Sequence, residues 1–433
     1  MKRKFTIYQV ENPVQFRQKM LNWSGQFNIF CLLDNHQYNS KESDFDCMLA
    51  VGVRHSFNVR AGNAFDDLQE FVDTHHDWIF GHLSYDLKNE IENLHSRNPD
   101  HIGFPDMFFF IPEIIIKFSG SDVLIGMISG EANDIFASIE SSEPKAPPRR
   151  MQKATGISNR TFLSKFTREE YLQTISNLKS HIRRGDCYEI NFCQEFYAVE
   201  QTMDPFETYI KLSRISPNPF AALYRINDKY CISSSPERYL KRVGDQIISQ
   251  PIKGTSARNI DNVEEDHRNR QSLLNKKERA ENVMTVDLVR NDLAKICKEG
   301  SVTVSELFGI YQFPQVYQMI STITGRIDPK LSIGRIFIST FPMGSMTGAP
   351  KLSVMKLIEK YEHTKRGLFS GAIGYITPEK DFDFNVVIRS ILYNASNKYI
   401  SIQAGSAITI NSEATDEYLE CLLKISALKA ALE

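Results

Sequence analysis

Hydrophobic residues along this chain fall into two kinds of pattern: short apolar runs rich in β-branched residues, and longer segments with helical spacing. In residues 168–183, apolar side chains recur every three or four positions, which predicts an amphipathic helix that ends before Gly185. The apolar run at 187–199 predicts the strand that follows. Further helices are predicted at 13–23, 64–75, 273–293, 349–361 and 413–432.

The predicted strands often follow one another directly, with turn signals between them. They are expected at 29–33, 45–53, 78–85, 107–117, 123–129, 220–225, 229–233, 239–243, 246–252 and 384–392. Runs of adjacent strands with interspersed helices favour an α+β fold over a regular βαβ winding. We therefore expect antiparallel β-sheets flanked by helices.

A stretch rich in proline, serine and basic residues divides the chain into two lobes. Residues 141–156 have the sequence SSEPKAPPRRMQKATG, which is typical of a solvated connector. The predicted organisation is an N-terminal lobe at 1–140, a linker at 141–156 and a larger domain at 157–433.

The composition is that of a globular chain with balanced charge. The 433 residues include 51 basic and 53 acidic side chains, a formal net charge of −2, so no basic field exists to gather nucleic acid. The N-terminus lacks the apolar core of a signal peptide, and the most apolar run, 107–118, is too short to span a bilayer. Seven scattered cysteines without a CxxC pair argue against a disulfide framework and a zinc site. We expect a cytoplasmic protein that binds neither nucleic acid nor membrane.

The pentapeptide Pro-Ile-Lys-Gly-Thr at 251–255 places a lysine at the end of a predicted strand. Gly254 permits a sharp bend and the close approach of a ligand to the main chain, and Thr255 adds a hydroxyl and an N–H group. A lysine shielded from water loses proton affinity, which makes Lys253 a candidate nucleophile or base. The alternative is an ordinary lysine-glycine turn at the surface.

Two predicted helices each carry a pair of glutamates three residues apart. Glu278 and Glu281 share a face of the first helix. Glu417 and Glu420 repeat the spacing on the last helix, with Lys424 one turn further on. Such carboxylates can hold a hard ion such as Mg²⁺, which takes one or two protein carboxylates and leaves room for water and an anionic ligand. Each pair alone is also what a solvated helix face presents.

Three other places carry candidate chemistry. The glycine- and hydroxyl-rich loop at 341–351 leads into a helix with Pro350 in its first turn, and it predicts either an anion site or a plain helix N-cap. Arg389 lies in the predicted strand 384–392 and needs an anionic partner, which is either a substrate carboxylate or a structural acid. Glu237 follows a predicted strand, where turn capping is the simplest interpretation.

Taken together, these segments resemble the chorismate-utilising enzymes, which include anthranilate synthase component I, isochorismate and salicylate synthases, and aminodeoxychorismate synthase component I. The resemblance runs from about residue 166 to the C-terminus, with a weaker match at 80–94. It rests on the ordered motifs GDCYEINF, SSSPERYL, PIKGT, ERAENVMTVDLVRNDL, VYQMIST, FPMGSMTGAPK, GLFSGAIGY, VVIRS, QAGSA and EYLECLLK. It implies a two-lobed chorismate-binding fold, with an N-terminal lobe of the anthranilate synthase component I type at 1–140 and the catalytic domain at 157–433.

Lys253 and Glu189 indicate a branch of this family. The aminodeoxychorismate enzymes typically carry lysine in PIKGT, whereas anthranilate synthases carry alanine there. Isochorismate and salicylate synthases use a water-activating lysine in the strand after the first helix, where this chain has Glu189. The resemblance therefore implies a Mg²⁺-dependent amino-group transfer that converts chorismate to 4-amino-4-deoxychorismate for 4-aminobenzoate and folate synthesis. The alternatives are anthranilate synthase component I and a non-catalytic chorismate-binding subunit.

The same resemblance implies roles for individual residues. Lys253 would attack C2 of chorismate as the C4 hydroxyl leaves, with Glu278 as general acid and Glu237 as a second acid or base. Mg²⁺ would be held by Glu281 and Glu420, with Glu417 near the metal. The implied substrate-binding residues are Thr255, Gly254, Gln318, Ser345, Phe369, Arg389, Lys424 and the main chain of Gly405, Ser406 and Ala407.

Four positions depart from the family pattern. Gln318 stands where a histidine is usual, which leaves hydrogen bonding but removes acid–base chemistry. Ser406 and Ala407 alter a usual Gly-Ala-Gly, and Phe369 stands where tyrosine or tryptophan is often seen. No nucleophile motif of a glutamine amidotransferase is present, so we expect ammonia to come from solution or from a separate amidotransferase subunit.

Overall fold

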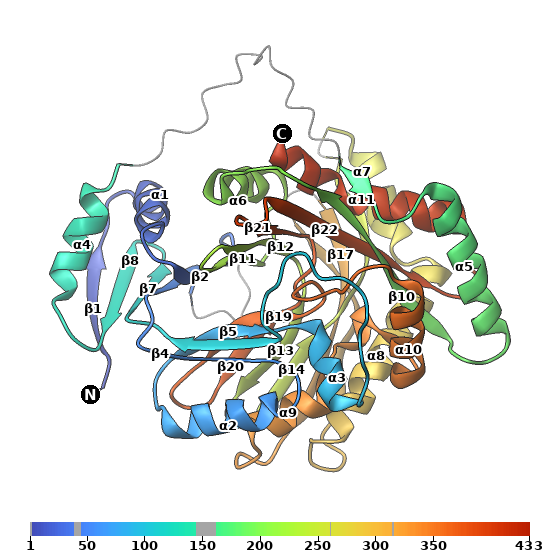
Figure 1. Ribbon diagram of the computed structural model, residues 1–433, viewed down its shortest axis with the longest axis horizontal. Coiled ribbons are helices and arrows are strands. Elements are labelled where there is room, and N and C mark those ends of the chain that lie inside the picture. Colours follow the sequence, from blue (N-terminus) through green and yellow to red (C-terminus); the bar gives the residue numbers. More distant parts are fainter. Residues whose placement is uncertain (1, 39–44, 144–161, 260, 314–315) are drawn as a thin grey trace.

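Two large antiparallel sheets form the framework of the protein (Figure 1). The structure, a computed structural model, describes residues 2–38, 45–143, 162–259, 261–313 and 316–433. One sheet has 12 strands and the other has 10, and residues of both contribute to a shared hydrophobic core. The predicted α+β fold of antiparallel sheets flanked by helices is confirmed.

The 12-stranded sheet contains the first strands of the chain and several of the last. In spatial order it runs β1 (Lys4–Gln9), β8 (Asp122–Met127), β7 (Ile114–Ser119), β3 (Cys47–Val51), β2 (Ile29–Asp34), β11 (Phe220–Ile226), β12 (Lys229–Ser235), β21 (Ser390–Asn394), β22 (Tyr399–Ile408), β10 (Glu189–Ala198) and β18 (Gly348–Ala349), with β9 (Leu163–Ser164) paired to β10.

The 10-stranded sheet crosses beneath the first in the view of Figure 1. Its order is β15 (Ile252–Ala257), β17 (Val316–Arg326), β14 (Gln246–Gln250), β13 (Arg238–Val243), β20 (Phe382–Asn385), β19 (Ala372–Ile376), β5 (Ile79–Leu83), β6 (Met107–Ile111) and β4 (His55–Val59), with β16 (Thr303–Gln312) paired to β17.

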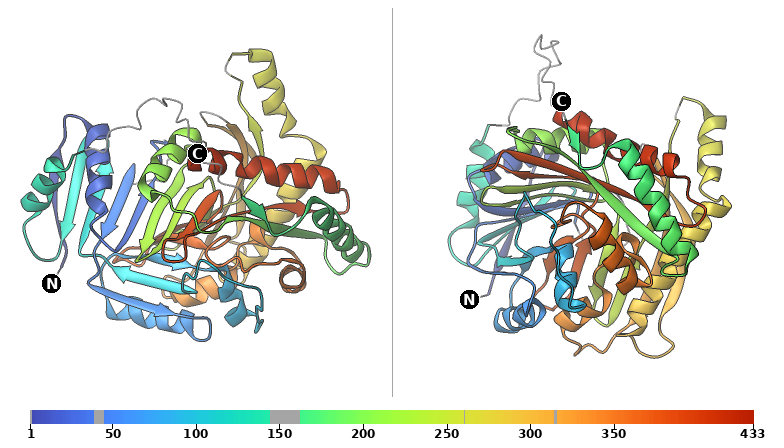
Figure 2. Two further views of the ribbon diagram at one scale, coloured as in Figure 1. Left: turned by 45° about the horizontal axis from the view of Figure 1, so that its top comes forward. Right: turned by 45° about the vertical axis from the view of Figure 1, so that its right-hand side comes forward.

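The helices lie mainly on the outer sides of the two sheets (Figures 1 and 2). They are α1 (Pro13–Ser24), α2 (Ala64–Thr74), α3 (Lys88–Ile91), α4 (Ala132–Ser141), α5 (Arg168–Arg183), α6 (Pro205–Ile215), α7 (Val263–Ser272), α8 (Lys276–Ala294), α9 (Ile333–Thr340), α10 (Lys351–Tyr361) and α11 (Ala414–Leu432), with short 3-10 turns η1 (Tyr85–Leu87) and η2 (Gly344–Met346). Helix α11 packs on β22 beside α5 and α6, whereas α8 packs on β15 and β17.

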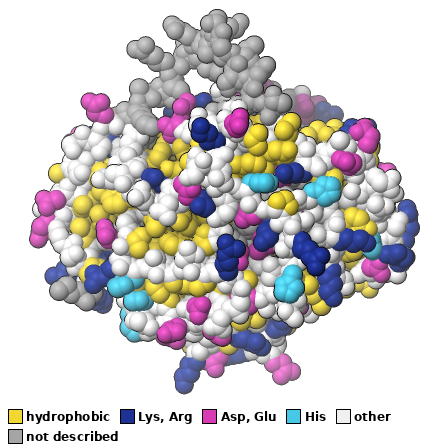
Figure 3. All heavy atoms as spheres, in the orientation of Figure 1, with side chains coloured by type: hydrophobic (Ala, Val, Ile, Leu, Met, Phe, Trp, Pro, Cys, Tyr) yellow, Lys and Arg dark blue, Asp and Glu magenta, His cyan; other side chains and the backbone are white. Residues whose placement is uncertain are grey.

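The predicted helix at 168–183 is confirmed as α5. A capping box explains its start, because the Thr167 hydroxyl accepts from the N–H of Glu170 and the Glu170 carboxylate accepts from the N–H of Thr167. None of the helices in the described ranges combines the length and apolar character needed to cross a bilayer. Acidic, basic and hydrophobic side chains are interspersed over the face shown in Figure 3.

The first 140 residues and the rest of the chain build the same two sheets. Strand β2 pairs with β11, and β5 pairs with β19, so each sheet joins early strands to late ones. The core likewise combines Phe80 and Phe109 with Phe384. The boundary predicted between the lobes therefore separates stretches of sequence whose strands share both sheets, and most of the predicted linker, 144–156, lies outside the described residues.

Two strand predictions were wrong because proline interrupts the ladder. The run at 107–117 forms two strands, β6 and β7, separated at Pro112 and placed in different sheets. The run at 246–252 is broken at Pro251 into β14 and β15. Proline has no N–H to donate to a neighbouring strand, so each break falls where hydrogen-bonded pairing cannot continue.

Two helix boundaries also differ from the prediction. The helix expected at 273–293 is α8, which begins at Lys276 because the Asn275 side chain caps the N–H of Glu278, and a separate helix, α7, precedes it. The helix expected from residue 349 begins at Lys351, with Pro350 as its N-cap.

Candidate active site

Lys253 lies in an irregular part of β15. Pairing with β17 shifts in register between Ile252 and Thr255, and Gly254 has a φ of +82°, which glycine adopts without strain. A Cβ added to Gly254 would lie 2.8 Å from Glu278 Oε2, so the glycine lets that carboxylate sit against the strand. The pentapeptide predicts that a ligand can approach the main chain closely at Gly254. A close approach is present, but the group that makes it is the carboxylate of Glu278.

The amine of Lys253 bridges the two sheets by pairing with Glu189 on β10. Lys253 Nζ lies 3.0 Å from Glu189 Oε1, and the two side chains are 10% and 4% exposed. Burial by itself lowers the pKa of Lys253, but Glu189, Glu281 and Glu237 together raise it above its ordinary value. Lys253 is therefore an ammonium at neutral pH in this arrangement.

Glu189 is the residue of this site whose role the sequence did not reveal. In the sequence its position stands out only through the resemblance, which places a lysine there in isochorismate and salicylate synthases. The single local signal was an acidic residue at the start of an apolar strand, which has many explanations. Its pairing with Lys253 depends on bringing β10 and β15 together from different sheets.

Glu237 is a buried acid between β12 and β13. Burial raises its pKa from 4.5 to about 7, although the nearby Ser345 hydroxyl and the charge of Lys253 act in the opposite direction. Its own N–H donates to Ser235 Oγ, but the carboxylate is only 4% exposed and is placed beside Lys253, so turn capping does not account for it. A carboxyl group with this pKa can give or take a proton near neutral pH.

The two glutamate pairs lie at different parts of the site. On α8, Glu278 lies against Gly254 and Glu281 acts on Lys253 through its charge. On α11, Glu420 is ion-paired with Lys424 at 2.6 Å. Lys424 Nζ also donates to the carbonyl oxygen of Gly405 at 2.7 Å, which ties the helix to β22.

Glu417 is not on a solvated helix face. Its side chain is buried, and its charge acts on the hydroxyl of Tyr171 on α5, so it lies toward the interface between α5 and α11. It is one turn away from Glu420, whose neighbours are Lys424 and Arg389.

Arg389 does not lie in a strand, and the prediction of a continuous strand at 384–392 was wrong. Strand β20 ends at Asn385 in one sheet, β21 begins at Ser390 in the other, and Arg389 lies in the crossover with a φ of +50°. Burial lowers the pKa of Arg389, and Glu420 opposes this shift. The expected need for an anionic partner is met here in part by Glu420, which leaves the planar guanidinium at the edge of the candidate site.

Alternation along β22 separates the roles open to Gly405, Ser406 and Ala407. Gly405 pairs with Cys193, and a Cβ at Gly405 would collide with the Cys193 sulfur, so the close pairing requires glycine. Ser406 is fully buried and faces the opposite side, near Tyr171 of α5. Only the main chain of this segment, and not the serine hydroxyl, is therefore available to the candidate site.

Four other predicted residues occupy distinct surroundings. Thr255 and Gln318 are directly opposite in the β15–β17 ladder. Gln318 is buried, and its Oε1 has no hydrogen-bond partner among the described residues. Ser345 is buried in η2, where its carbonyl accepts from Asn191 of β10. Phe369 packs in the main hydrophobic core, which is consistent with a wall and not with a polar contact.

The two carboxylates expected to hold Mg²⁺, Glu281 and Glu420, lie on separate helices, α8 and α11. Among the described residues, no group of three or more His, Cys, Asp and Glu side chains is assembled to hold a metal. Glu281 and Glu420 offer hard carboxylate oxygens on two helices, and Mg²⁺ commonly uses one or two such ligands together with water and substrate oxygens.

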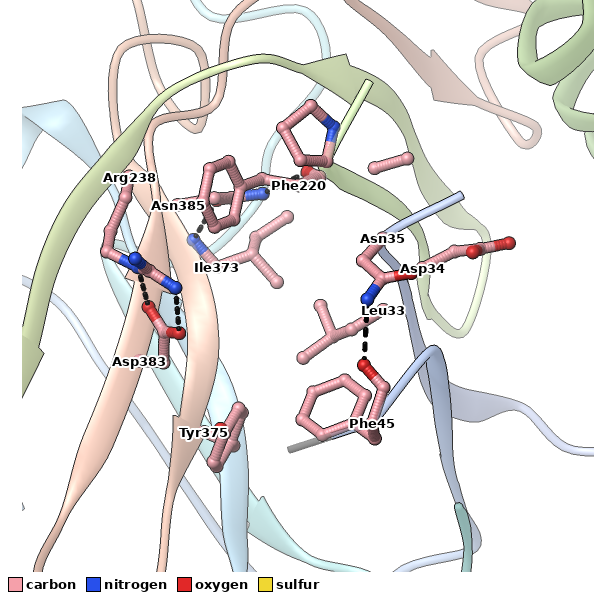
Figure 4. A pocket seen from close by; sticks show the side chains of 12 residues that line it. Leu33, Asp34, Asn35, Phe45, Phe220, Arg238, Ile373, Tyr375, Asp383 and Asn385 are labelled. Atoms are coloured by element: carbon pink, nitrogen blue, oxygen red, sulfur yellow. Dashed lines mark hydrogen bonds and ion pairs between the residues drawn. The ribbon is translucent and has the colours of Figure 1, made fainter. Parts of the chain in front are cut away.

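A separate cavity lies between the sheets, away from Lys253. Figure 4 shows Arg238 directed at Asp383, with contacts of 2.9 and 3.0 Å, and Asn35 donating to the carbonyl of Phe45 at 2.9 Å. Its lining consists of Leu33, Asp34, Asn35, Phe45, Pro219, Phe220, Ala221, Arg238, Ile373, Tyr375, Asp383 and Asn385. The candidate catalytic residues are absent from this lining.

The family of chorismate binding enzymes matches residues 34–430, and the chain belongs to this family. It is 31% identical over 364 residues to aminodeoxychorismate synthase component 1 of Bacillus subtilis (strain 168), covering 82% of this chain and 76% of that protein. It is also 31% identical over 362 residues to anthranilate synthase component 1 of Thermus thermophilus, covering 82% and 77%. The crystal structure of anthranilate synthase component I from Streptococcus pneumoniae TIGR4 superposes with a TM-score of 0.77 at 26% identity, covering 90% of this chain and 93% of that one.

Replacing Glu237 by glutamine should change how stability depends on pH. The pKa of Glu237 is about 7 in the folded protein and 4.5 ordinarily. The contribution of its protonated side chain to the free energy of unfolding is therefore fully present below pH 4.5 and is lost as pH rises through 7. Relative to Glu237→Gln, the free energy of unfolding of the wild type should fall by on the order of 2 kcal/mol between pH 5 and pH 8. Urea unfolding across this range measures the difference, and parallel curves for the two proteins would contradict the assignment.

Proposed function

We propose that this protein is the chorismate-aminating component of an aminodeoxychorismate synthase. It forms 4-amino-4-deoxychorismate from chorismate and ammonia in the cytoplasm, for 4-aminobenzoate and folate synthesis. The observation that carries the proposal is Lys253, buried between the sheets, paired with Glu189 at 3.0 Å and close to Glu237, with Glu278 against the next residue, Gly254. A lysine with acids on several sides has the groups that a covalent amine intermediate requires.

The proposed reaction divides one displacement at the ring into two. The unprotonated amine of Lys253 forms a bond to C2 of chorismate while the ring double bond shifts and the C4–O bond breaks. Glu278 donates a proton to the departing hydroxyl, which leaves as water. Ammonia then forms a bond to C4 and the C2–lysine bond breaks, which restores the amine. The proton lost from the new ammonium group returns to Glu278, and Glu237 serves as a second acid or base beside the lysine.

The carboxylates of chorismate would be bound by cationic and main-chain groups around the same place. Arg389 and Lys424 supply positive charge, and the main chain of Gly405 to Ala407 supplies N–H donors. Glu281 and Glu420 would hold Mg²⁺, with Glu417 one turn from Glu420. When bound, this ion supplies positive charge that attracts the carboxylate on the ring.

Gln318 and Phe369 fit supporting roles. The buried Oε1 of Gln318 is an unfilled hydrogen-bond acceptor, and a substrate hydroxyl or an incoming ammonia molecule would satisfy it. Thr255, opposite Gln318, and the buried Ser345 would add hydroxyl groups, while Phe369 would form an apolar wall. Ammonia would be supplied by a separate glutamine amidotransferase subunit.

The purified chain should aminate chorismate with ammonium salts and Mg²⁺ but should not use glutamine by itself. Mass spectrometry and fluorescence distinguish 4-amino-4-deoxychorismate from anthranilate, the product of the alternative function. Adding a glutamine amidotransferase subunit should make glutamine effective. Anthranilate as the main product would overturn the proposed function in favour of anthranilate synthase component I, and turnover with glutamine by the single chain would refute the need for a partner.

Glu281→Gln and Glu420→Gln should each weaken the response of turnover to Mg²⁺. The amide keeps the volume of the side chain but removes the charge that attracts the ion, so the Mg²⁺ concentration for half-maximal activity should rise by about tenfold or more. Titration of activity with Mg²⁺ measures the effect. Asp287→Asn, an exposed substitution on α8 at the Arg290 ion pair, is the matched control. An unchanged Mg²⁺ dependence in both Gln variants would rule out this metal site.

Lys253→Arg and Lys253→Ala separate the covalent role of the lysine from its charge. Arginine keeps the charge but cannot attack, so both variants should lose turnover by on the order of 100-fold or more. Lys253→Ala should also shift residual product toward anthranilate-type chemistry, because ammonia can then add at C2. Mass analysis of the peptide containing Lys253 during turnover should show a chorismate-derived adduct in the wild type alone. Near-full activity of the arginine variant would reduce Lys253 to an electrostatic anchor.

A further inference from the structure

Glu189 is held rigidly at the start of β10. Its main chain is confined by β18, where a Cβ at Gly348 would collide with the carbonyl of Glu189, and the adjacent Tyr188 N–H donates to the carbonyl of Ala349 at 2.7 Å. The side chain is 4% exposed, and Oε1 accepts a hydrogen bond from Lys253 Nζ at 3.0 Å. A carboxylate fixed at both the main chain and one oxygen holds the lysine amine in one place.

The second oxygen of Glu189, Oε2, lacks a partner among the described residues, as does the second oxygen of Glu195. Oε2 is buried and has no hydrogen-bond donor within the part of the chain that the structure describes. A charged oxygen buried without a donor costs free energy, and protonation of the carboxyl group removes that cost. Glu189 therefore holds the lysine amine through one oxygen and keeps a second oxygen that is unpaired among the described residues, which places it to take a proton from that amine.

Glu195 on the same strand shows that a buried glutamate has a different role when it lacks a cation. Glu189 and Glu195 are six residues apart and so share one face of β10. The Oε1 atom of Glu195 accepts hydrogen bonds from Ser401 Oγ at 2.6 Å and Tyr399 hydroxyl at 3.2 Å. These neutral donors tie β10 to β22 and offer no group for chemistry, which makes Glu195 a matched structural control.

Two other acids act on Lys253, and their settings suit other tasks. Glu237, beside the start of β13, has a pKa raised by burial to about 7, so it can take up or release a proton near neutral pH. Glu281 on α8 acts on the lysine through its charge and is the proposed ligand of Mg²⁺. Glu278 approaches Gly254 and is the proposed donor to the leaving hydroxyl. Glu189 is the acid hydrogen-bonded to the amine itself.

We propose that Glu189 positions Lys253 and accepts its proton before the amine attacks the substrate. This inference rests on the proposed function, because it assumes that Lys253 is the nucleophile. One Nζ–H bond breaks and its proton moves to Oε1, which neutralises both members of the pair. The freed electron pair of Nζ forms the bond to C2. When ammonia later displaces the lysine, the proton returns from Glu189 to Nζ, so the pair ends the cycle as it began.

A single-turnover experiment with Glu189→Gln tests this role. Wild type, Glu189→Gln and Glu195→Gln are mixed with chorismate and Mg²⁺ without ammonium, quenched, and analysed for the adduct on Lys253 between pH 6 and pH 9. Wild type and Glu195→Gln should form the adduct with one shared pH profile that changes little apart from the titration of Glu237 near pH 7, because the proton of Lys253 stays within the pair. Glu189→Gln should be slower at pH 7 by on the order of 100-fold. Its rate should rise by about tenfold per pH unit, because the lysine must then lose its proton to solvent.

Glu189→Asp is a second variant, which distinguishes loss of the carboxylate from a general folding defect. It keeps the carboxylate but shortens its reach, so adduct formation should be slower than in the wild type while keeping the wild-type pH profile. Thermal unfolding of each variant confirms that the protein is folded. If Glu189→Gln forms the adduct at the wild-type rate with the wild-type pH profile, the inference is overturned and the proposed function stands. If the wild type itself forms no adduct on Lys253, the covalent route in the proposed function fails, and this inference fails with it.

Discussion

The buried ion pair between Lys253 and Glu189 is the interaction on which the candidate site depends. Each residue belongs to a different sheet, and neither charge has enough exposed surface to be solvated on its own. A charge left alone in such a place is strongly destabilising, whereas a well-placed pair is tolerated. The two sheets must therefore meet in one register at this point, and that requirement fixes the irregular path of β15 around Gly254.

A second buried ion pair, between Arg366 and Glu362, ties η2 to β10. Arg366 donates to both oxygens of Glu362 at 3.0 and 2.6 Å, and also to the carbonyls of Met346 and Asn191. These contacts bind η2, with its Ser345, to the strand that carries Glu189. Because Arg366 also lies over the ring of Tyr85, the N-terminal part of the chain helps to hold the site in shape.

Four glutamates around one lysine acquire different properties from their surroundings. Glu237 is buried, and burial raises its pKa to about 7, so this carboxyl group can take up or release a proton near neutral pH. Glu189 stays paired with the ammonium, Glu278 lies against a glycine in the strand, and Glu281 is on a helix at the edge. When the surroundings of similar carboxyl groups differ in this way, their proton affinities differ too, and one site can supply both an acid and a base.

The sequence by itself determined the local elements, the family and the residue types of the site. Helix α5 followed from the 3.6-residue spacing of its apolar side chains, and the motif around Lys253 indicated a reactive lysine, because such signals depend on neighbours along the chain. Tertiary structure alone decided which sheet each strand joins. The run at 107–117 divides between the two sheets, and Arg389 lies where the chain passes from one sheet to the other. The pattern of apolar residues is the same in a strand of either sheet, so it cannot reveal these changes. For the same reason the sequence does not predict that Glu189 pairs with Lys253. The two residues are 64 positions apart, and their ion pair depends on how the two sheets pack, which no repeating pattern in the sequence reports.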